Sequence, residues 1–209
     1  MKLPDKDLEP GLAETIEKVR ALAVPEDRKK VLQPLVDYIQ AKVEHGGRAH
    51  LNFICTHNSR RSQLSQVWAR TAAYCFGVPA SCYSGGVEVT AFNERAVASL
   101  ERSGFRVVSG GGENPVYSVF YSEKQPPVRA FSKLYDDPEN SAPRFAAVMT
   151  CSDADENCPF IPGTEMRIPV RYEDPKAFDG TPQEADRYDE RSLQIASEMF
   201  YVFSKIKTA

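Results

Sequence analysis

Cys55 and Arg61 have the residue types and the spacing for oxyanion chemistry. They frame a Cys-x5-Arg loop with the sequence Cys55-Thr56-His57-Asn58-Ser59-Arg60-Arg61. A cysteine thiolate is a nucleophile, and an arginine guanidinium can bind two oxygens of a tetrahedral anion in a planar fork. The spacing therefore predicts a site in which Cys55 attacks an anion that Arg61 holds. An inert buried cysteine is the alternative interpretation.

The segments on either side of this loop are predicted to be a strand and a helix. Residues 49–54 alternate and end apolar, and residues 63–76 carry apolar side chains at helical spacing. The first amides of such a helix have no partner within it, and successive loop amides can form a concave anion site. We therefore expect a positive field at Cys55 that favours its thiolate.

The loop resembles the phosphate-binding loop of a superfamily that contains low-molecular-weight tyrosine phosphatases and thioredoxin-coupled arsenate reductases. Ser62-Gln63 is similar to the reductase branch, because the phosphatases usually have Ser-Pro there. His57 stands where glycine is usual, and Arg60 where cysteine is common. The resemblance implies that Cys55 is the nucleophile and that Ser62 supports its thiolate. It also implies that the substrate is bound by Thr56, His57, Asn58, Ser59, Arg60 and Arg61.

A second motif follows the predicted buried strand 145–150. Its sequence, Cys-Ser-Asp-Ala-Asp-Glu-Asn-Cys-Pro, spans residues 151–159 and closely resembles the redox segment of thioredoxin-coupled arsenate reductases. The resemblance implies a relay in which Cys55 attacks arsenate and Cys151 attacks the adduct to release arsenite. Cys158 then attacks the Cys55–Cys151 disulfide, and thioredoxin reduces the product. Such a relay requires a mobile segment, and the polar residues between the cysteines suit a weakly held helical turn.

Two other interpretations of this cysteine pair stay open. The pair could be half of a zinc site, or two unrelated buried thiols. The chain has only three histidines, and with this spacing they give no complete ligand set, so no metal site is predicted.

Asp174 is the candidate acid. The sequence Glu173-Asp174-Pro175 follows the apolar run 166–170 and resembles the Asp-Pro general-acid loop of the same superfamily. A carboxylic acid above the anion site can protonate an oxygen as its bond to the central atom breaks. Asp-Pro is also an ordinary turn sequence, so the assignment depends on the other two motifs.

All three motifs follow predicted strands, and ligand sites in open α/β sheets lie beyond the carboxyl ends of the strands. Strands are also predicted at 80–84 and 105–108, with a helix at 94–103 between them, capped by Asn93. The resemblance covers roughly residues 49–205. It implies an α/β fold with a four-stranded parallel sheet, order 2-1-3-4, flanked by helices.

Two segments lie outside this core. Residues 1–47 are predicted to be an N-terminal helical extension, followed by a catalytic domain over 48–209. An insertion at about 110–137 is rich in β-forming residues and is predicted to be a β-hairpin. A final helix at about 185–205 presents a broad apolar face for the sheet.

Composition limits the classes of function. A chain of 209 residues with 42% apolar content can bury one core, and its net charge of −3 gives no basic face for nucleic acid. No apolar stretch reaches the length of a membrane span, and the start lacks a signal-peptide core, so a cytoplasmic protein is expected. Five cysteines argue against a secreted disulfide framework, and Cys75 and Cys82 are interpreted as core residues. The oligomeric state is left open.

The first functional hypothesis is arsenate reduction regenerated by thioredoxin, with no tightly bound cofactor. The second is hydrolysis of a phosphomonoester, most plausibly phosphotyrosine, through a phosphocysteine. The third is a non-enzymatic oxyanion or redox sensor. The resemblance leaves potassium (K+) dependence in doubt: Asn58 and Ser84 match its ligand positions, Gln66 replaces an acid, and the remaining aspartate has no counterpart.

Overall fold

A four-stranded parallel sheet is the centre of the computed structural model, which describes residues 7–157 and 160–208. Its strands are β1 (Ala49–Cys55), β2 (Ala80–Gly86), β6 (Phe145–Met149) and β7 (Thr164–Pro169). They lie in the order β2-β1-β6-β7, and every pairing is parallel. The predicted α/β class and the 2-1-3-4 order of the parallel strands are confirmed.

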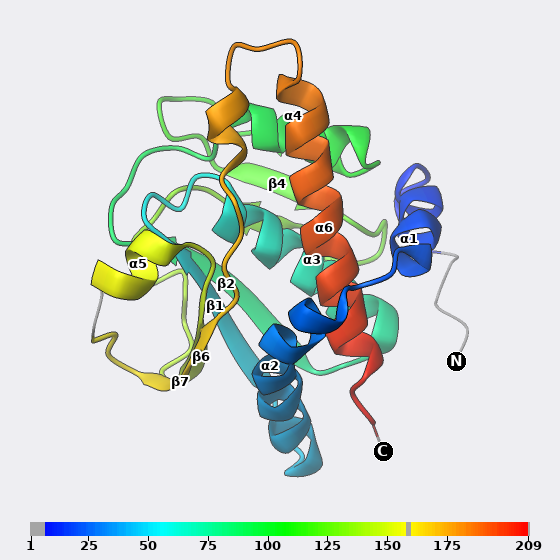
Figure 1. Cartoon of the computed structure of the whole chain (residues 1–209), viewed down its shortest axis with the longest axis vertical. Helices are drawn as coiled ribbons and strands as arrows, with labels where there is room; N and C mark the ends of the chain where they lie inside the picture. Colours follow the sequence, from blue (N-terminus) through cyan, green and yellow to red (C-terminus); the bar gives the residue numbers. More distant parts are fainter. Residues whose placement is uncertain (1–6, 158–159, 209) are drawn as a thin grey trace.

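Three long helices cover one face of this sheet: α2 (Glu26–Glu44), α3 (Arg61–Phe76) and α6 (Glu184–Ser204) (Figure 1). Leu51 and Phe53 of β1 belong to the same apolar cluster as side chains of all three helices. Trp68 of α3 is fully buried and donates from Nε1 to the Ser192 hydroxyl of α6 at 2.9 Å. The shorter helix α1 (Leu12–Ala21) packs against α6.

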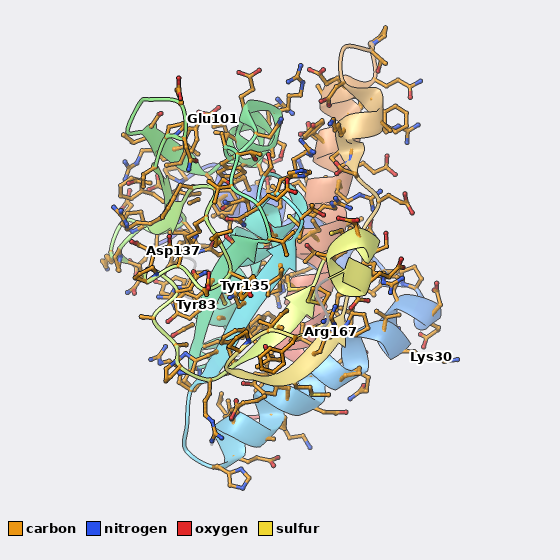
Figure 2. The ribbon with its side chains drawn as sticks, turned by 90° about the vertical axis from the view of Figure 1, so that its left-hand side faces the viewer. Lys30, Tyr83, Glu101, Tyr135, Asp137 and Arg167 are labelled. Carbon is orange, nitrogen blue, oxygen red and sulfur yellow. The ribbon has the colours of Figure 1, made fainter. Side chains whose placement is uncertain are left out.

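The opposite face of the sheet carries a second, smaller apolar cluster. Ile54 and Met149 belong to it, together with Ala154 of the short helix α5 (Ser152–Asn157). Tyr135 packs against the cluster from the end of the insertion, and Figure 2 shows this side of the sheet. Because both faces of the sheet are covered, almost every residue of β1 is buried.

The segment after α4 (Glu94–Arg102) departs from the prediction. The helix predicted between the strands at 80–84 and 105–108 implies a parallel crossover. The second strand is present as β3 (Arg106–Ser109), but it pairs antiparallel with β4 (Tyr117–Phe120). Adding β5 (Val128–Ala130) gives a separate three-stranded sheet in the order β3-β4-β5. The physical reason is exposure: β3 has mostly exposed side chains, whereas a central parallel strand must be buried on both faces.

Several local predictions are confirmed. The Asn93 side chain accepts a hydrogen bond from the Arg95 amide at 3.0 Å and so caps α4. The predicted hairpin is present as β4 and β5, and the final helix as α6. The division of the chain at residue 47 stays a prediction. Within the described ranges, no helix combines the length and the apolar character that a membrane span needs.

Candidate active site

The predicted anion loop lies where β1 ends and α3 begins. Cys55 is the last residue of β1, and Arg61 is the first of α3, so five residues connect the strand to the helix. Cys55 is buried, with 3% of its surface exposed, and its Sγ lies 3.0 Å from the Ser62 hydroxyl. The loop therefore joins a strand to a helix, as the sequence predicts, with the thiol at its base.

Asn58 fixes the shape of this loop. Its φ of 46° is the one left-handed backbone conformation outside glycine in the described residues. Its side-chain Nδ2 donates to the Ser62 hydroxyl at 2.8 Å, so that oxygen acts as the acceptor of this bond. The Ser62 proton is then free to point at Cys55 Sγ, which is the arrangement that stabilises a thiolate.

The backbone carbonyls of the loop accept hydrogen bonds from residues that lie outside the loop. The oxygens of Thr56, His57 and Ser59 accept hydrogen bonds of 2.8–2.9 Å, and the donors are the amides of Val87, Glu88 and Asn93 and the hydroxyl of Ser132. Because these carbonyls point outward, the loop amides are available to face an anion. The close approach requires Gly86: a Cβ there would lie 2.7 Å from the Thr56 oxygen and 2.8 Å from the Asn58 nitrogen.

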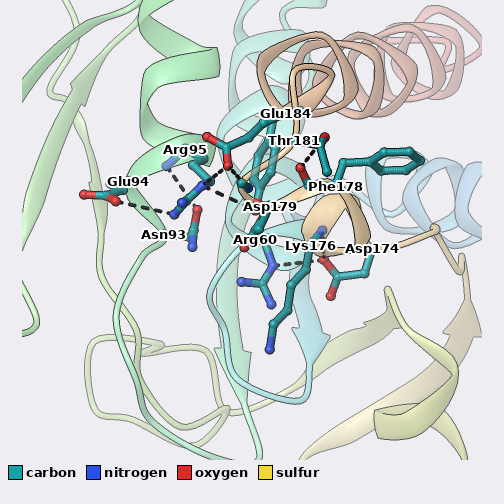
Figure 3. Close-up of polar contacts among 12 residues, drawn as sticks. Arg60, Asn93, Glu94, Arg95, Asp174, Lys176, Phe178, Asp179, Thr181 and Glu184 are labelled. Carbon is teal, nitrogen blue, oxygen red and sulfur yellow. Dashed lines mark hydrogen bonds and ion pairs between the residues drawn. The ribbon is translucent and has the colours of Figure 1, made fainter.

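Asp174 joins both arginines of the loop. Its carboxylate lies 2.9 Å from Arg60 Nε and 2.7 Å from an Arg61 nitrogen, and Figure 3 shows the pair with Arg60. Burial alone would raise the pKa of the Asp174 carboxyl, but Arg61, the Lys176 amide and Arg60 together hold that pKa below its usual value. A small pocket is lined by Cys55, His57, Ser59, Arg60, Arg61 and Asp174. The predicted nucleophile, anion clamp and acid therefore line one pocket.

Cys151 comes to the same site from the neighbouring strand β6. It is buried, with 1% of its surface exposed, and shares an apolar cluster with Cys55. Its Sγ lies 3.5 Å from the Thr56 hydroxyl of the loop, and the Ala154 amide donates to it at 3.4 Å. Cys158, the third predicted thiol, lies outside the described residues.

The helix between these cysteines is held more firmly than the sequence predicted. The Asp155 side chain is only 10% exposed and forms ion pairs with Arg167 at 2.8 Å and Arg171 at 2.6 Å. Burial would raise the pKa of Asp155, but the two arginines lower it. The Thr56 hydroxyl also donates to the Asp153 carboxylate of α5 at 2.7 Å. The predicted weakly held turn is therefore held by polar contacts, and motion of α5 requires the Asp155 ion pairs to break.

A larger cavity of about 530 Å³ adjoins the anion pocket and shares His57, Ser59 and Arg60 with it. Phe92 and Tyr117 also line it, with ring centroids 5.6 Å apart, and so does Lys176. The sequence motifs did not indicate this cavity, because Tyr117 comes from the insertion. No local signal reports that the insertion folds back beside the loop.

The matched potassium positions do not fit a cation. Asn58 Oδ1 already accepts hydrogen bonds from Gln63 at 3.0 Å and from the Lys133 amide at 3.1 Å. The Ser84 hydroxyl donates to Gln66 Oε1 at 2.6 Å. The Gln66 side chain, which replaces the acid, therefore binds the Ser84 hydroxyl directly. In the described part of the chain, no three His, Cys, Asp or Glu side chains are grouped to hold a metal ion.

Comparisons with known proteins agree with this geometry. No protein-family model matches the chain. Arsenate reductase 2 of Staphylococcus epidermidis is 29% identical over 124 residues, covering 59% of this chain and 76% of that protein. An arsenate reductase of Bacillus licheniformis is 26% identical over 153 residues, covering 73% and 93%. A solved low-molecular-weight phosphotyrosine phosphatase from Vibrio cholerae has a TM-score of 0.51 at 12% identity, covering 75% of this chain and 94% of its own.

The fold is that of the low-molecular-weight phosphatases, and the site has a Cys-x5-Arg loop at the carboxyl end of the first parallel strand. The fold and the two sequence relatives support the resemblance of the motifs to the superfamily of low-molecular-weight tyrosine phosphatases and arsenate reductases. Both sequence relatives named above are arsenate reductases.

Proposed function

We propose that this protein is an arsenate reductase that uses Cys55, Cys151 and Cys158 in turn and is regenerated by thioredoxin. The observation that carries the proposal is the position of Cys151. A phosphatase reaction needs no second thiol, yet Cys151 is buried against the catalytic loop, 3.5 Å from Thr56. The reductase relatives support the same interpretation.

The first step is attack on arsenic. The Cys55 thiolate forms a sulfur–arsenic bond while Arg61 and the loop amides bind the remaining oxygens. The bond from arsenic to a hydroxyl group of arsenate breaks, and Asp174 supplies one proton so that this hydroxyl leaves as water. Ser62, at 3.0 Å from Cys55 Sγ, stabilises the thiolate before the attack.

The second step transfers electrons. The Cys151 thiolate attacks Cys55 Sγ, forming a disulfide, and the electron pair of the broken sulfur–arsenic bond stays on arsenic, which leaves as arsenite. Cys158 then attacks Cys151 and displaces the Cys55 thiolate. A thioredoxin dithiol finally reduces the Cys151–Cys158 disulfide and is itself oxidised.

Asp174 is expected to contribute about 10²–10⁴-fold to kcat, the usual range for a general acid. Its lowered pKa means that the resting carboxylate is ionised between two arginines. An oxyanion on Arg61 competes for that guanidinium, and its negative charge favours protonation of Asp174. We therefore expect Asp174→Asn to lower kcat by that factor, measured at neutral pH.

The neighbouring exposed acid provides the control, because Glu173→Gln removes one charge without touching the pocket. On aryl phosphates, the Asp174→Asn variant should lose least activity with the most acidic leaving group, which needs no proton to depart. An equal loss with every leaving group would show that Asp174 only supports the arginines.

The proposal is tested by coupling the protein to thioredoxin, thioredoxin reductase and NADPH. We expect arsenate-dependent NADPH consumption that requires each component, with arsenite as the product. Omission of arsenate or of thioredoxin is the control. NADPH consumption that arsenate does not stimulate would contradict the assignment.

A second candidate function is hydrolysis of an organic phosphomonoester, and the cavity beside the anion pocket favours it. Its volume of about 530 Å³ far exceeds the space that an inorganic oxyanion needs. Phe92 and Tyr117 could contact the organic group of a phosphate ester there. Hydrolysis that is faster than arsenate reduction, and that survives loss of both Cys151 and Cys158, would favour this function.

A further inference from the structure

A second basic cavity lies apart from the active site. It has a volume of about 300 Å³, adjoins the edge strand β2 and the segment around β5, and shares no lining residue with either pocket at the catalytic loop. Four cationic side chains and one carboxylate line it, which gives a formal charge of +3. These residues are Arg48, Arg70, Arg129, Lys133 and Glu139.

Lys133 is the most informative residue of this cavity. It is 2% exposed, and its Nζ has no hydrogen-bond partner in the described part of the chain. The ammonium lies 4.5 Å from the centre of the Phe131 ring. Burial lowers its pKa to about 8, although Asp137 and Glu139 oppose this shift. A buried ammonium without an acceptor is costly, so this cavity is suited to a ligand that supplies one.

The arginines leave donors for such a ligand. Arg48 and Arg70 each direct one nitrogen at the same carbonyl, that of Ala80, at 3.3 and 3.4 Å. Each guanidinium carries five N–H donors in a fixed fork that matches phosphate oxygens. Arg129 is paired with Glu139 at 2.6 Å, so the net positive charge comes from the other three cations.

We propose that this cavity binds an anion with at least two phosphate-type charges, such as a diphosphate group. A single oxyanion would leave part of the +3 charge uncompensated, and the volume lies at the lower end of small-molecule sites. Tyr83, Val128 and two prolines give the cavity an apolar part, which an organic group on the diphosphate could contact. The proposal does not depend on the reaction catalysed at Cys55.

The cavity also adjoins the residues that brace the catalytic loop. Lys133 donates from its backbone amide to Asn58 Oδ1 at 3.1 Å. Gln66, which lines the cavity, accepts from the Ser84 hydroxyl at 2.6 Å. A ligand on the Lys133 side chain would therefore contact a residue whose backbone amide binds Asn58 of the catalytic loop.

The test is calorimetric titration of the full chain with inorganic pyrophosphate. We expect two ions bound per chain, one at the catalytic loop and one at the basic cavity. Arg61→Gln should remove the first, whereas Arg129→Gln and Lys133→Met should each weaken the second by about tenfold or more. Lys133→Met removes a buried charge at similar length, and the exposed Arg129 gives a variant that does not disturb the core.

Arg102→Gln is the matched control, because it removes an exposed arginine on α4 that pairs with Asp189, away from both sites. It should bind both ions as the wild type does. The proposal is overturned if the wild type binds one ion that Arg61→Gln abolishes. It is also overturned if Arg129→Gln and Lys133→Met bind pyrophosphate with wild-type stoichiometry and affinity.

Discussion

Cys55→Ser is expected to abolish both arsenate reduction and aryl phosphate hydrolysis, with a loss of roughly 10⁴–10⁶-fold in kcat. A serine hydroxyl is almost fully protonated at neutral pH, and the hydrogen bond with Ser62 is not enough to ionise it. Arg61 can still bind the anion in this variant. Turnover should therefore fall while arsenate still binds, which calorimetry with arsenate can measure separately from the rate.

Cys82→Ser provides the matched control for the nucleophile. Cys82 is buried in β2, and burial raises the pKa of its thiol to about 12, so it stays protonated at neutral pH. We expect this variant to retain the wild-type rate within a few fold. Substantial turnover by Cys55→Ser, or a comparable loss in Cys82→Ser, would contradict the assignment of Cys55.

The second large effect is expected at Cys151. Cys151→Ser should stop thioredoxin-dependent arsenate turnover, a loss of about 10³-fold or more, and leave aryl phosphate hydrolysis within a few fold of the wild type. The two reactions share Cys55, Arg61 and Asp174, but in the proposed relay only reduction needs a thiol to attack Cys55 Sγ. The ratio of the two rates therefore isolates the relay from damage to the pocket.

Trapping experiments identify the order of the thiols. After one turnover in the absence of thioredoxin, the wild type should hold a Cys151–Cys158 disulfide, and Cys158→Ser should hold a Cys55–Cys151 disulfide. Alkylation followed by peptide mass spectrometry distinguishes these products, with arsenate omitted as the control. A Cys55–Cys158 disulfide in Cys151→Ser that supports normal turnover would show that Cys151 is not the required intermediary.

The sequence predicted the parts of the site that depend on local order. A strand, a loop and a helix with Cys55 and Arg61 at the two junctions follow from residue spacing and periodicity, and so does the cap at Asn93. The buried strand that leads into Cys151 was also predicted from its apolar run, whereas the redox role of the motif that follows is implied by the family resemblance alone. Each of these inferences uses residues within one element or its immediate neighbour.

The remaining features depend on partners far away in the chain. Residues 106–109 have enough β-forming character for a strand, but their antiparallel partner and their exposure are set by β4. The two arginines that bind Asp155 lie 12 and 16 residues further on. Local periodicity carries no information about such pairings, so the turn was predicted to be weakly held and the strand was assigned to the wrong sheet.

The bracing of the catalytic loop from the insertion has a consequence for the order of folding. The hydrogen bonds from Ser132 to His57 and from Lys133 to Asn58 each close a span of 75 residues. Closing such a span costs chain entropy before its contacts can form, whereas α3 needs only neighbouring residues. We therefore expect the left-handed conformation of Asn58 to be stabilised late in folding. During refolding, recovery of anion binding then follows the formation of the helices and marks the completion of the fold.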